Sequence, residues 1–424
     1  MIAYISGNRV GRMVKMNMYN RLLEVILLFI GLTFSLEALS QKVPSYVPLN
    51  SFSPNETDYS DLQQIPVFDE NIKVVGLGES THGTREFSLM RHRIFRFLVQ
   101  EKQFNTLFLE ADYGSCLPLN RYIQGEDENL EEAMELLRLW PWKTVEFREM
   151  AEWMRDYNFQ NPTEKLNLVG CDVQFESPCL IELNRILVLN GEPEVCGFYS
   201  DDDLIMNEAL KDSLPEWWEA FLNRREAIKI DSLEYHILLN SFDQLISKSD
   251  DLDAARNHRD SCMAVNIDNY LKDVPETRGI FWAHNEHIRI MKPNSSLKRA
   301  GAFLKEKLRD TYTAIGLETA KGTLNAIGFD KEKGGYYGLQ QFKLKNRRKM
   351  LGSLAPKQEL FFVLSNSVQN QGNYLVNSIG SIYSKRSAFR KRYCTDKGLK
   401  SYDAIVFIRH STPTTVIGTD KRWE

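Results

Sequence analysis

The order of apolar and polar positions between residues 71 and 110 predicts a strand, a helix and a second strand. A mostly apolar run at 72–75 precedes a polar turn, and residues 84–103 then carry apolar side chains at helical spacing. Another apolar run, at 107–109, follows within the length of one βαβ unit. Ligands of open parallel sheets bind outside the carboxyl ends of the strands, so polar residues that follow these strands are candidates for chemistry.

The same kind of pattern continues to the end of the chain. Further segments with helical or strand periodicity are predicted: helices at 129–140, 145–157 and 300–308, and strands at 166–170, 279–283, 312–317, 360–364 and 404–408. The turn at 140–144 (Trp-Pro-Trp-Lys-Thr) either lines a pocket or seals the joint between two helices. The predicted fold class is α/β: residues 71–424 form a central, mostly parallel sheet flanked by helices, with a large all-helical insertion at about 177–270.

The N-terminus has the order of a secretory signal. Basic residues between Arg9 and Arg21 precede an apolar run at 22–36, and Ala38-Leu39-Ser40 has the small-x-small form of a cleavage site. Glu24 and the short apolar core argue against a spanning helix. We therefore expect residues 1–40 to be a cleaved signal peptide, 41–70 a polar, turn-rich leader, and the protein to be periplasmic or secreted without a stable membrane anchor.

Composition narrows the class of partner. The 424 residues are 43% hydrophobic and carry a formal net charge of -4. Binding to nucleic acid or to anionic lipid needs a concentrated excess of Lys and Arg, which this balance does not provide. The six cysteines are scattered without a CxxC spacing, which excludes a small disulfide scaffold and a zinc ribbon. A small, largely uncharged molecule is the expected partner.

Acid/base residues gather at the predicted strand ends. Of the seven histidines, three follow strands, and two glutamates do the same: His82, His284, His287, Glu79 and Glu110. A carboxylate beside a histidine fixes its tautomer and raises its basicity, so this combination suits proton transfer from water. The same Glu and His residues could instead supply ligands for Zn²⁺, although the chain has no H-E-x-x-H motif.

One basic residue falls on the apolar face of the first predicted helix. Arg91 lies between Phe87 and Ile94 in the apolar stripe, so we expect it to pair with Glu79 or Glu110. The pattern places three other basic residues of this helix on a solvated face: Arg85, His92 and Arg96.

Several ordered blocks of sequence resemble the erythromycin esterase family, which includes members named for succinoglycan biosynthesis. The blocks are Gly78-Glu79-Ser80-Thr81-His82-Gly83 with Glu86 and Arg91, Leu109-Glu110, Trp153-Met154-Arg155-x-Tyr157-Asn158, Gly170-x-Asp172-x-Gln174, Arg259-Asp260-x-x-Met263-Ala264-x-Asn266, Trp282-Ala283-His284-Asn285-x-His287 and Tyr402-Asp403-Ala404. The resemblance runs from about residue 70 to the end of the chain.

This resemblance implies an α/β fold and hydrolysis of a macrolide-type lactone by water, without a covalent intermediate, metal or cofactor. It implies that His82 is the general base, that Glu79 and Glu110 are carboxylates that orient it or position the water, and that Arg91 is a structural or oxyanion-facing cation. The remaining implied site residues are His284, His287 and Arg259, or less favourably Arg256 in place of Arg259. Two alternatives stay open: a metal-dependent hydrolase or peptidase, and a non-catalytic binding protein for a polysaccharide or lipid intermediate.

Overall fold

The computed structural model describes residues 46–126, 129–193, 213–224, 228, 230, 232–247, 251–290, 297–330, 335–345, 351, 357–364, 376–383 and 398–418. These residues belong to one compact unit, Ser45–Glu424. The expected signal peptide, 1–40, and part of the expected helical insertion lie outside the described residues. Within the described ranges, no helix is long and apolar enough to cross a membrane.

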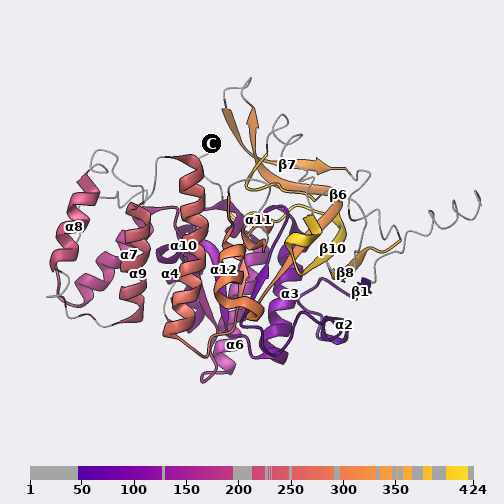
Figure 1. Ribbon diagram of the computed structural model, residues 1–424, viewed down its shortest axis with the longest axis horizontal. Coiled ribbons are helices and arrows are strands. Elements are labelled where there is room, and N and C mark those ends of the chain that lie inside the picture. Colours follow the sequence, from indigo (N-terminus) through magenta and orange to yellow (C-terminus); the bar gives the residue numbers. More distant parts are fainter. Residues whose placement is uncertain are drawn as a thin grey trace, which may run out of the picture. The chain divides into compact units, whose positions relative to one another are not determined.

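A single mixed sheet forms the centre of this unit (Figure 1). Its strand order is β1 (Tyr46–Pro48), β8 (Leu360–Leu364), β10 (Ala404–Ser411), β6 (Tyr312–Asp330), β2 (Val74–Leu77), β5 (Gly279–Trp282), β3 (Thr106–Asp112) and β4 (Asn167–Asp172). The six strands from β10 to β4 are parallel to one another, and β8 and β1 add antiparallel strands at one edge. The mostly parallel central sheet predicted from the sequence is confirmed.

The central strands are buried on both faces, which explains their continuous apolar sequence. Alternate residues of each strand point to opposite faces: Val74 lies in one apolar cluster and Val75 in the other. Phe281 and Ile280 of β5 divide between the same two clusters. Strands covered on both sides hold their ends rigidly, so side chains placed just beyond those ends have fixed positions.

Helices cover the two faces. The long helix α3 (Arg85–Lys102) packs with α6 (Val145–Gln160) on one face, and α12 (Ala300–Leu308) packs with α10 (Leu252–Asp273) on the other. The other helices are α2 (Ser60–Gln63), α4 (Tyr113–Gln124), α5 (Leu130–Leu136), α7 (Glu176–Leu189), α8 (Leu214–Arg224), α9 (Leu233–Ile246) and α11 (Asn285–Ile288). Between β4 and β5, the described residues contain helices α7 to α10 and no strand (Figure 1).

The described part of the expected leader is more regular than its turn-rich sequence indicated. Strand β1 pairs with β8, and α2 places Leu62 in the core. The buried guanidinium of Arg93, on α3, holds this segment by donating to both carboxylate oxygens of Asp61 and to two backbone carbonyl oxygens. This contact joins residues far apart in sequence, so local pattern could not reveal it.

Strand β6 continues well beyond the stretch at 312–317 that the sequence pattern predicted. Its second half pairs with the antiparallel β7 (Gly335–Leu344) and with the short parallel β9 (Ile382–Tyr383), neither of which was predicted. The alternation in β7 is irregular because Gly338 has a positive φ of 83° within a register shift. Asn325 of β6 and Ile379, just before β9, form backbone bridges with Gly83 and Thr81, so they contribute backbone to the surroundings of the candidate site.

Candidate active site

Three adjacent strands bring the predicted acid/base residues together. Leu77 of β2 and Leu109 of β3 both pair with Trp282 of β5, so these three residues lie at the same level of the sheet. Glu79 follows Leu77, Glu110 follows Leu109, and His284 follows Trp282. All three side chains are buried, with relative exposures of 0%, 6% and 5%. The register therefore gathers them at one point of the sheet edge.

The first contact pair joins Glu79 to Arg91. Arg91 donates to Glu79 Oε2, one of the two carboxylate partners that the sequence predicted. Its guanidinium carbon lies 3.9 Å from the centre of the Trp282 ring, which places the cation over an aromatic face. Burial lowers the pKa of Arg91 to about 10, against the opposing effect of Glu79, so this side chain is charged at neutral pH.

The second oxygen of Glu79 fixes the tautomer of His82. The distance from His82 Nδ1 to Glu79 Oε1 is 2.7 Å. An ionised carboxylate only accepts hydrogen bonds, so Nδ1 carries the proton and Nε2 keeps its lone pair. The side chain of His82 is 10% exposed, whereas that of Glu79 is 1% exposed. His82 can therefore take a proton from a molecule that enters the site.

His284 has the opposite tautomer. Its Nδ1 accepts a hydrogen bond from the backbone N–H of Glu286 at 3.2 Å, so the proton of the neutral ring is on Nε2. Burial, and next the neighbouring His82, lower the pKa of His284 to about 3, so the ring is neutral at pH 7. Among the described residues Nε2 is buried and has no hydrogen-bond partner. The ring centroids of His82 and His284 are 5.0 Å apart. The acceptor nitrogen, His82 Nε2, and the donor nitrogen, His284 Nε2, therefore lie on neighbouring rings.

Glu110 lies at the centre of a charged network. Its Oε2 accepts the backbone N–H of His284 at 2.7 Å, and its Oε1 lies 2.9 Å from Arg259 Nη2 and 3.2 Å from His287 Nε2. Burial alone would raise the pKa of Glu110, but His287 and then Arg259 hold it well below its usual value. Glu110 is therefore ionised and orients the loop that carries His284.

Arg259 reaches the site from α10, as the sequence resemblance implied in preference to Arg256. Arg259 donates to both oxygens of Asp172, at 2.8 Å from Nε and 2.5 Å from Nη2. Its side chain is 28% exposed. Burial would lower the pKa of Arg259, but Asp172 and Glu110 raise it, so the guanidinium is permanently charged.

His287 is a buried cation and not a base. Its Nδ1 lies 2.8 Å from Asp260 Oδ1, and its Nε2 faces Glu110. Burial would lower the pKa of His287, but Asp260 and then Glu110 raise it to about 10. Both ring nitrogens therefore donate at neutral pH. Arg299 Nη1 donates to the other oxygen of Asp260 at 3.0 Å and completes the chain of charges.

Sequence reasoning assigned no role to Asp172, Asp260 or Arg299. Asp172 and Asp260 stand inside blocks of sequence that resemble the family, so the resemblance could have pointed to them. Their partners, however, come from distant elements of the chain. Arg299 lies outside every such block, and no sequence signal pointed to it. Asp172 favours the charged form of Arg259, Asp260 favours the charged form of His287, and Arg299 favours the ionised form of Asp260.

The aromatic turn η1 (Trp140–Trp142) seals the joint between two helices, one of the two alternatives that the sequence left open. Both Trp side chains are buried at 2% exposure. Trp142 Nε1 donates to the backbone oxygen of Glu110 at 3.1 Å, and its ring centre lies 6.2 Å from that of His82. The turn closes the joint before α6 and also forms part of the surroundings of His82.

The expectation that His92 belongs to a solvated face is wrong. His92 is 3% exposed, and its ring centre lies 5.3 Å from that of Trp153 on α6. Burial, and next Arg96, lower the pKa of His92 to about 3. The reason is that α3 is covered by the central sheet on one side and by α6 on the other, so its buried surface is wider than one stripe. Arg85 is, as expected, partly exposed, at 47%.

The described residues contain no group of three or more His, Cys, Asp or Glu side chains arranged to hold a metal ion. Glu79 and His82 bond to each other, and so do Glu110 and His287. The structure thus shows these side chains as hydrogen-bonded pairs.

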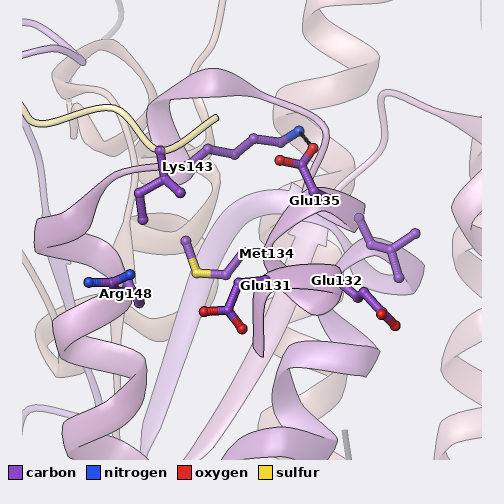
Figure 2. Close-up of a pocket in the computed structure, with 8 residues that line it drawn as sticks. Glu131, Glu132, Met134, Glu135, Lys143 and Arg148 are labelled. Atoms are coloured by element: carbon purple, nitrogen blue, oxygen red, sulfur yellow. Dashed lines mark hydrogen bonds and ion pairs between the residues drawn. The ribbon is translucent and has the colours of Figure 1, made fainter. Parts of the chain in front are cut away.

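A cavity of about 550 Å³ lies apart from these residues, between α5 and the start of α6. Figure 2 shows Met134 in its wall, with Arg148 and Glu131 on either side and Lys143 bonded to Glu135 at its rim. None of the seven predicted site residues lines it. This opening is thus not where the acid/base groups lie, and we do not assign the chemistry to it.

A known family of proteins matches most of this chain. The sequence profile of the erythromycin esterase family covers residues 99–188 and 207–411. The chain belongs to the erythromycin esterase family. Membership supports a hydrolase of the esterase type that acts on a small molecule.

Individual relatives are distant. The chain is 27% identical to erythromycin esterase type II of Escherichia coli over 128 residues, a match that spans only 30% of either protein. It is 22% identical to erythromycin esterase type I of the same species over 321 residues, 66% of this chain and 78% of that protein. A solved structure of a succinoglycan biosynthesis protein has the same fold, with a TM-score of 0.70 and 22% identity, covering 88% of this chain and 96% of that one.

Proposed function

We propose that this protein is an exported hydrolase that cleaves an ester bond, most simply a macrolide-type lactone, by direct attack of water activated by His82. One observation carries the proposal: His82, held by Glu79, offers a free Nε2 beside His284, a neutral ring whose Nε2–H has no partner among the described residues. An acceptor for a proton of water and a donor for the carbonyl oxygen thus lie on adjacent rings.

The reaction balances with these two groups. His82 Nε2 takes a proton from water as the water oxygen attacks the ester carbonyl carbon, and the carbonyl electrons move to its oxygen. The C–O bond to the leaving alkoxide then breaks as the carbonyl re-forms, and the alkoxide takes the proton from the His82 imidazolium. Glu79 stabilises that imidazolium through Nδ1–H, and no covalent intermediate on the protein is needed.

His284 is the best-placed donor for the developing oxyanion. Arg259 and His287 were also candidates, but both donate to buried carboxylates, whereas His284 Nε2 is free among the described residues. A neutral donor also fits the site electrostatically, because a second imidazolium next to His82 would oppose its protonation. Removal of one oxyanion donor costs on the order of 10² to 10³ in rate.

The names of the relatives support lactones as the first substrates to try, and the basic, apolar and Ala-x-Ser order of residues 1–40 supports export. Both remain proposals for this chain.

The test is hydrolysis of a panel of lactones and simple esters by the wild type and three variants. His82→Asn should abolish turnover, His284→Asn should lower kcat about 10² to 10³-fold, and His410→Asn, at an exposed histidine of β10, should leave it unchanged. Circular dichroism verifies that each variant is folded. Equal activity in the His82→Asn variant would refute the mechanism, and no hydrolysis of any ester by the wild type would favour the binding-protein alternative.

A further inference from the structure

A short segment from the C-terminal part of the chain lies directly against the proposed base. We define residues 376–381 as the strap. A Cβ atom at Gly380 would stand 3.9 Å from His82 Cδ2, which is ordinary van der Waals contact. Cδ2 is the ring carbon bonded to Nε2, so the strap passes beside the nitrogen that takes the proton. Among the described residues no other atom lies within 4 Å of that Cβ, so a side chain at residue 380 would fit and would occupy space next to the His82 ring.

Backbone hydrogen bonds fix the strap on both sides of Gly380. Ile379 N–H donates to the carbonyl oxygen of Ser80 at 2.8 Å, within the same turn that carries His82. The carbonyl oxygen of Ser381 accepts the N–H of Ile327, on β6, at 2.8 Å. Gly380 is thus held between two anchored residues, and its distance from the His82 ring is set by the fold.

A buried carboxyl group provides a third anchor. Glu318, on β6, is 2% exposed, and its Oε2 accepts the backbone N–H of Asn377 at 3.1 Å and its side-chain Nδ2 at 3.3 Å. Asn377 Nδ2 also donates to the backbone oxygen of Thr319 at 2.7 Å. Oε2 of Glu318 therefore accepts hydrogen bonds from both the backbone and the side chain of Asn377, and so holds this residue in place near the start of the strap.

We propose that the strap determines substrate specificity by forming one wall of the space beside His82 Nε2. Gly380 sets the space available there to the acyl side of the ester. Glu318 is the positioning residue that holds this wall in place. The inference rests on the proposed function only in taking His82 Nε2 as the reacting nitrogen. In this proposal Glu318 acts without touching the substrate, and Gly380 acts because it has no side chain.

The first test does not depend on enzymatic activity. Diethyl pyrocarbonate acylates accessible imidazole nitrogens, and peptide mass spectrometry gives the rate at His82 relative to His410, whose side chain is 54% exposed in the same molecule. Gly380→Ala and Gly380→Val should slow modification of His82 progressively, the valine by about tenfold, because added methyl groups stand next to the attacking nitrogen. Glu318→Leu, which removes both acceptor oxygens, should accelerate it, and Glu318→Gln, which keeps one, should change it less.

The second test uses two esters that differ only in the bulk of the acyl group. Gly380→Val should lower kcat/KM for the bulky ester about tenfold more than for the small one, and Glu318→Leu should lessen the preference between them. Glu132→Leu, an exposed position on α5, is the control. If Glu318→Leu fails to fold, the Gly380 series and Glu318→Gln still decide the matter.

The outcomes separate the two proposals. Altered His82 modification without hydrolysis of any ester supports the wall and contradicts the proposed function. Ester hydrolysis with unchanged modification rates and an unchanged ratio between the two esters overturns the wall and leaves the proposed function standing.

Discussion

The substitution Glu318→Gln is expected to remove a pH dependence of stability that the buried carboxyl imposes. Burial raises the pKa of Glu318 from 4.5 to about 8, and the hydrogen bonds from Asn377 only partly oppose this. Apart from Asn377, the groups that face the carboxyl are the Thr319 backbone and Asn285, whose Nδ2 is 3.5 Å away, and none of them is charged. The folded protein therefore holds a proton here that the unfolded chain has released at neutral pH.

The sign and size follow from linkage. A pKa raised in the folded state gives stability that is fully present below the unfolded pKa and is lost as pH rises through the folded pKa. A tenfold change in proton affinity corresponds to about 1.4 kcal/mol, so raising the pKa from 4.5 to about 8 gives ~5 kcal/mol of stability. This stability is lost gradually as the pH rises from 4.5 to about 8, and above that pH none of it remains. Between pH 5.5 and 7.5 the wild type should lose roughly 2.5 kcal/mol relative to the glutamine variant, whose side chain does not titrate.

Urea unfolding at pH 5.5, 6.5 and 7.5 measures this difference. The free energy of unfolding of Glu318→Gln minus that of the wild type should rise steadily with pH. Glu132→Gln, the same change at an exposed position, should show no such trend. A difference for Glu318→Gln that stays constant over this range would refute the raised pKa and show that the carboxyl is ionised or hydrated in the fold.

Three further outcomes are expected. Arg91→Met should destabilise the fold by roughly 3 to 5 kcal/mol in thermal or urea unfolding, because it leaves the buried Glu79 without its cation. Arg85→Met should have a clearly smaller effect, because Arg85 is half-exposed and its partner Glu146 keeps the hydrogen bonds from the Thr415 backbone N–H; equal effects would contradict the importance of the Arg91–Glu79 pair. Ester hydrolysis should survive dialysis against a strong chelator, and loss of activity that Zn²⁺ restores would transfer the site to the metal-dependent alternative. Intact mass of the exported protein should correspond to a start at Gln41, and a mature protein that retains residues 1–40 would contradict the predicted signal peptide.

The sequence by itself determined the elements whose signal is local. The strands β2, β5 and β8 and the helices α3, α6 and α12 appear close to their predicted bounds, because burial on one or two faces imposes a periodicity that each segment carries alone. The sequence also placed Glu79, Glu110 and His284 at the ends of predicted strands, and the fold brings these candidates together because the strand ends of a parallel sheet converge. Arg91 was also found this way, from a charge in an apolar stripe.

Only the tertiary structure decided what each histidine does. His82, His284 and His287 look alike in sequence, yet one is an acceptor at Nε2, one a neutral donor and one a buried cation. The differences come from Glu79, from the Glu286 backbone and from Asp260, because a tautomer and a pKa are properties of the surroundings. The strap at 376–381 was invisible for the same reason: its contact with His82 exists only once β6 has brought two distant parts of the chain side by side.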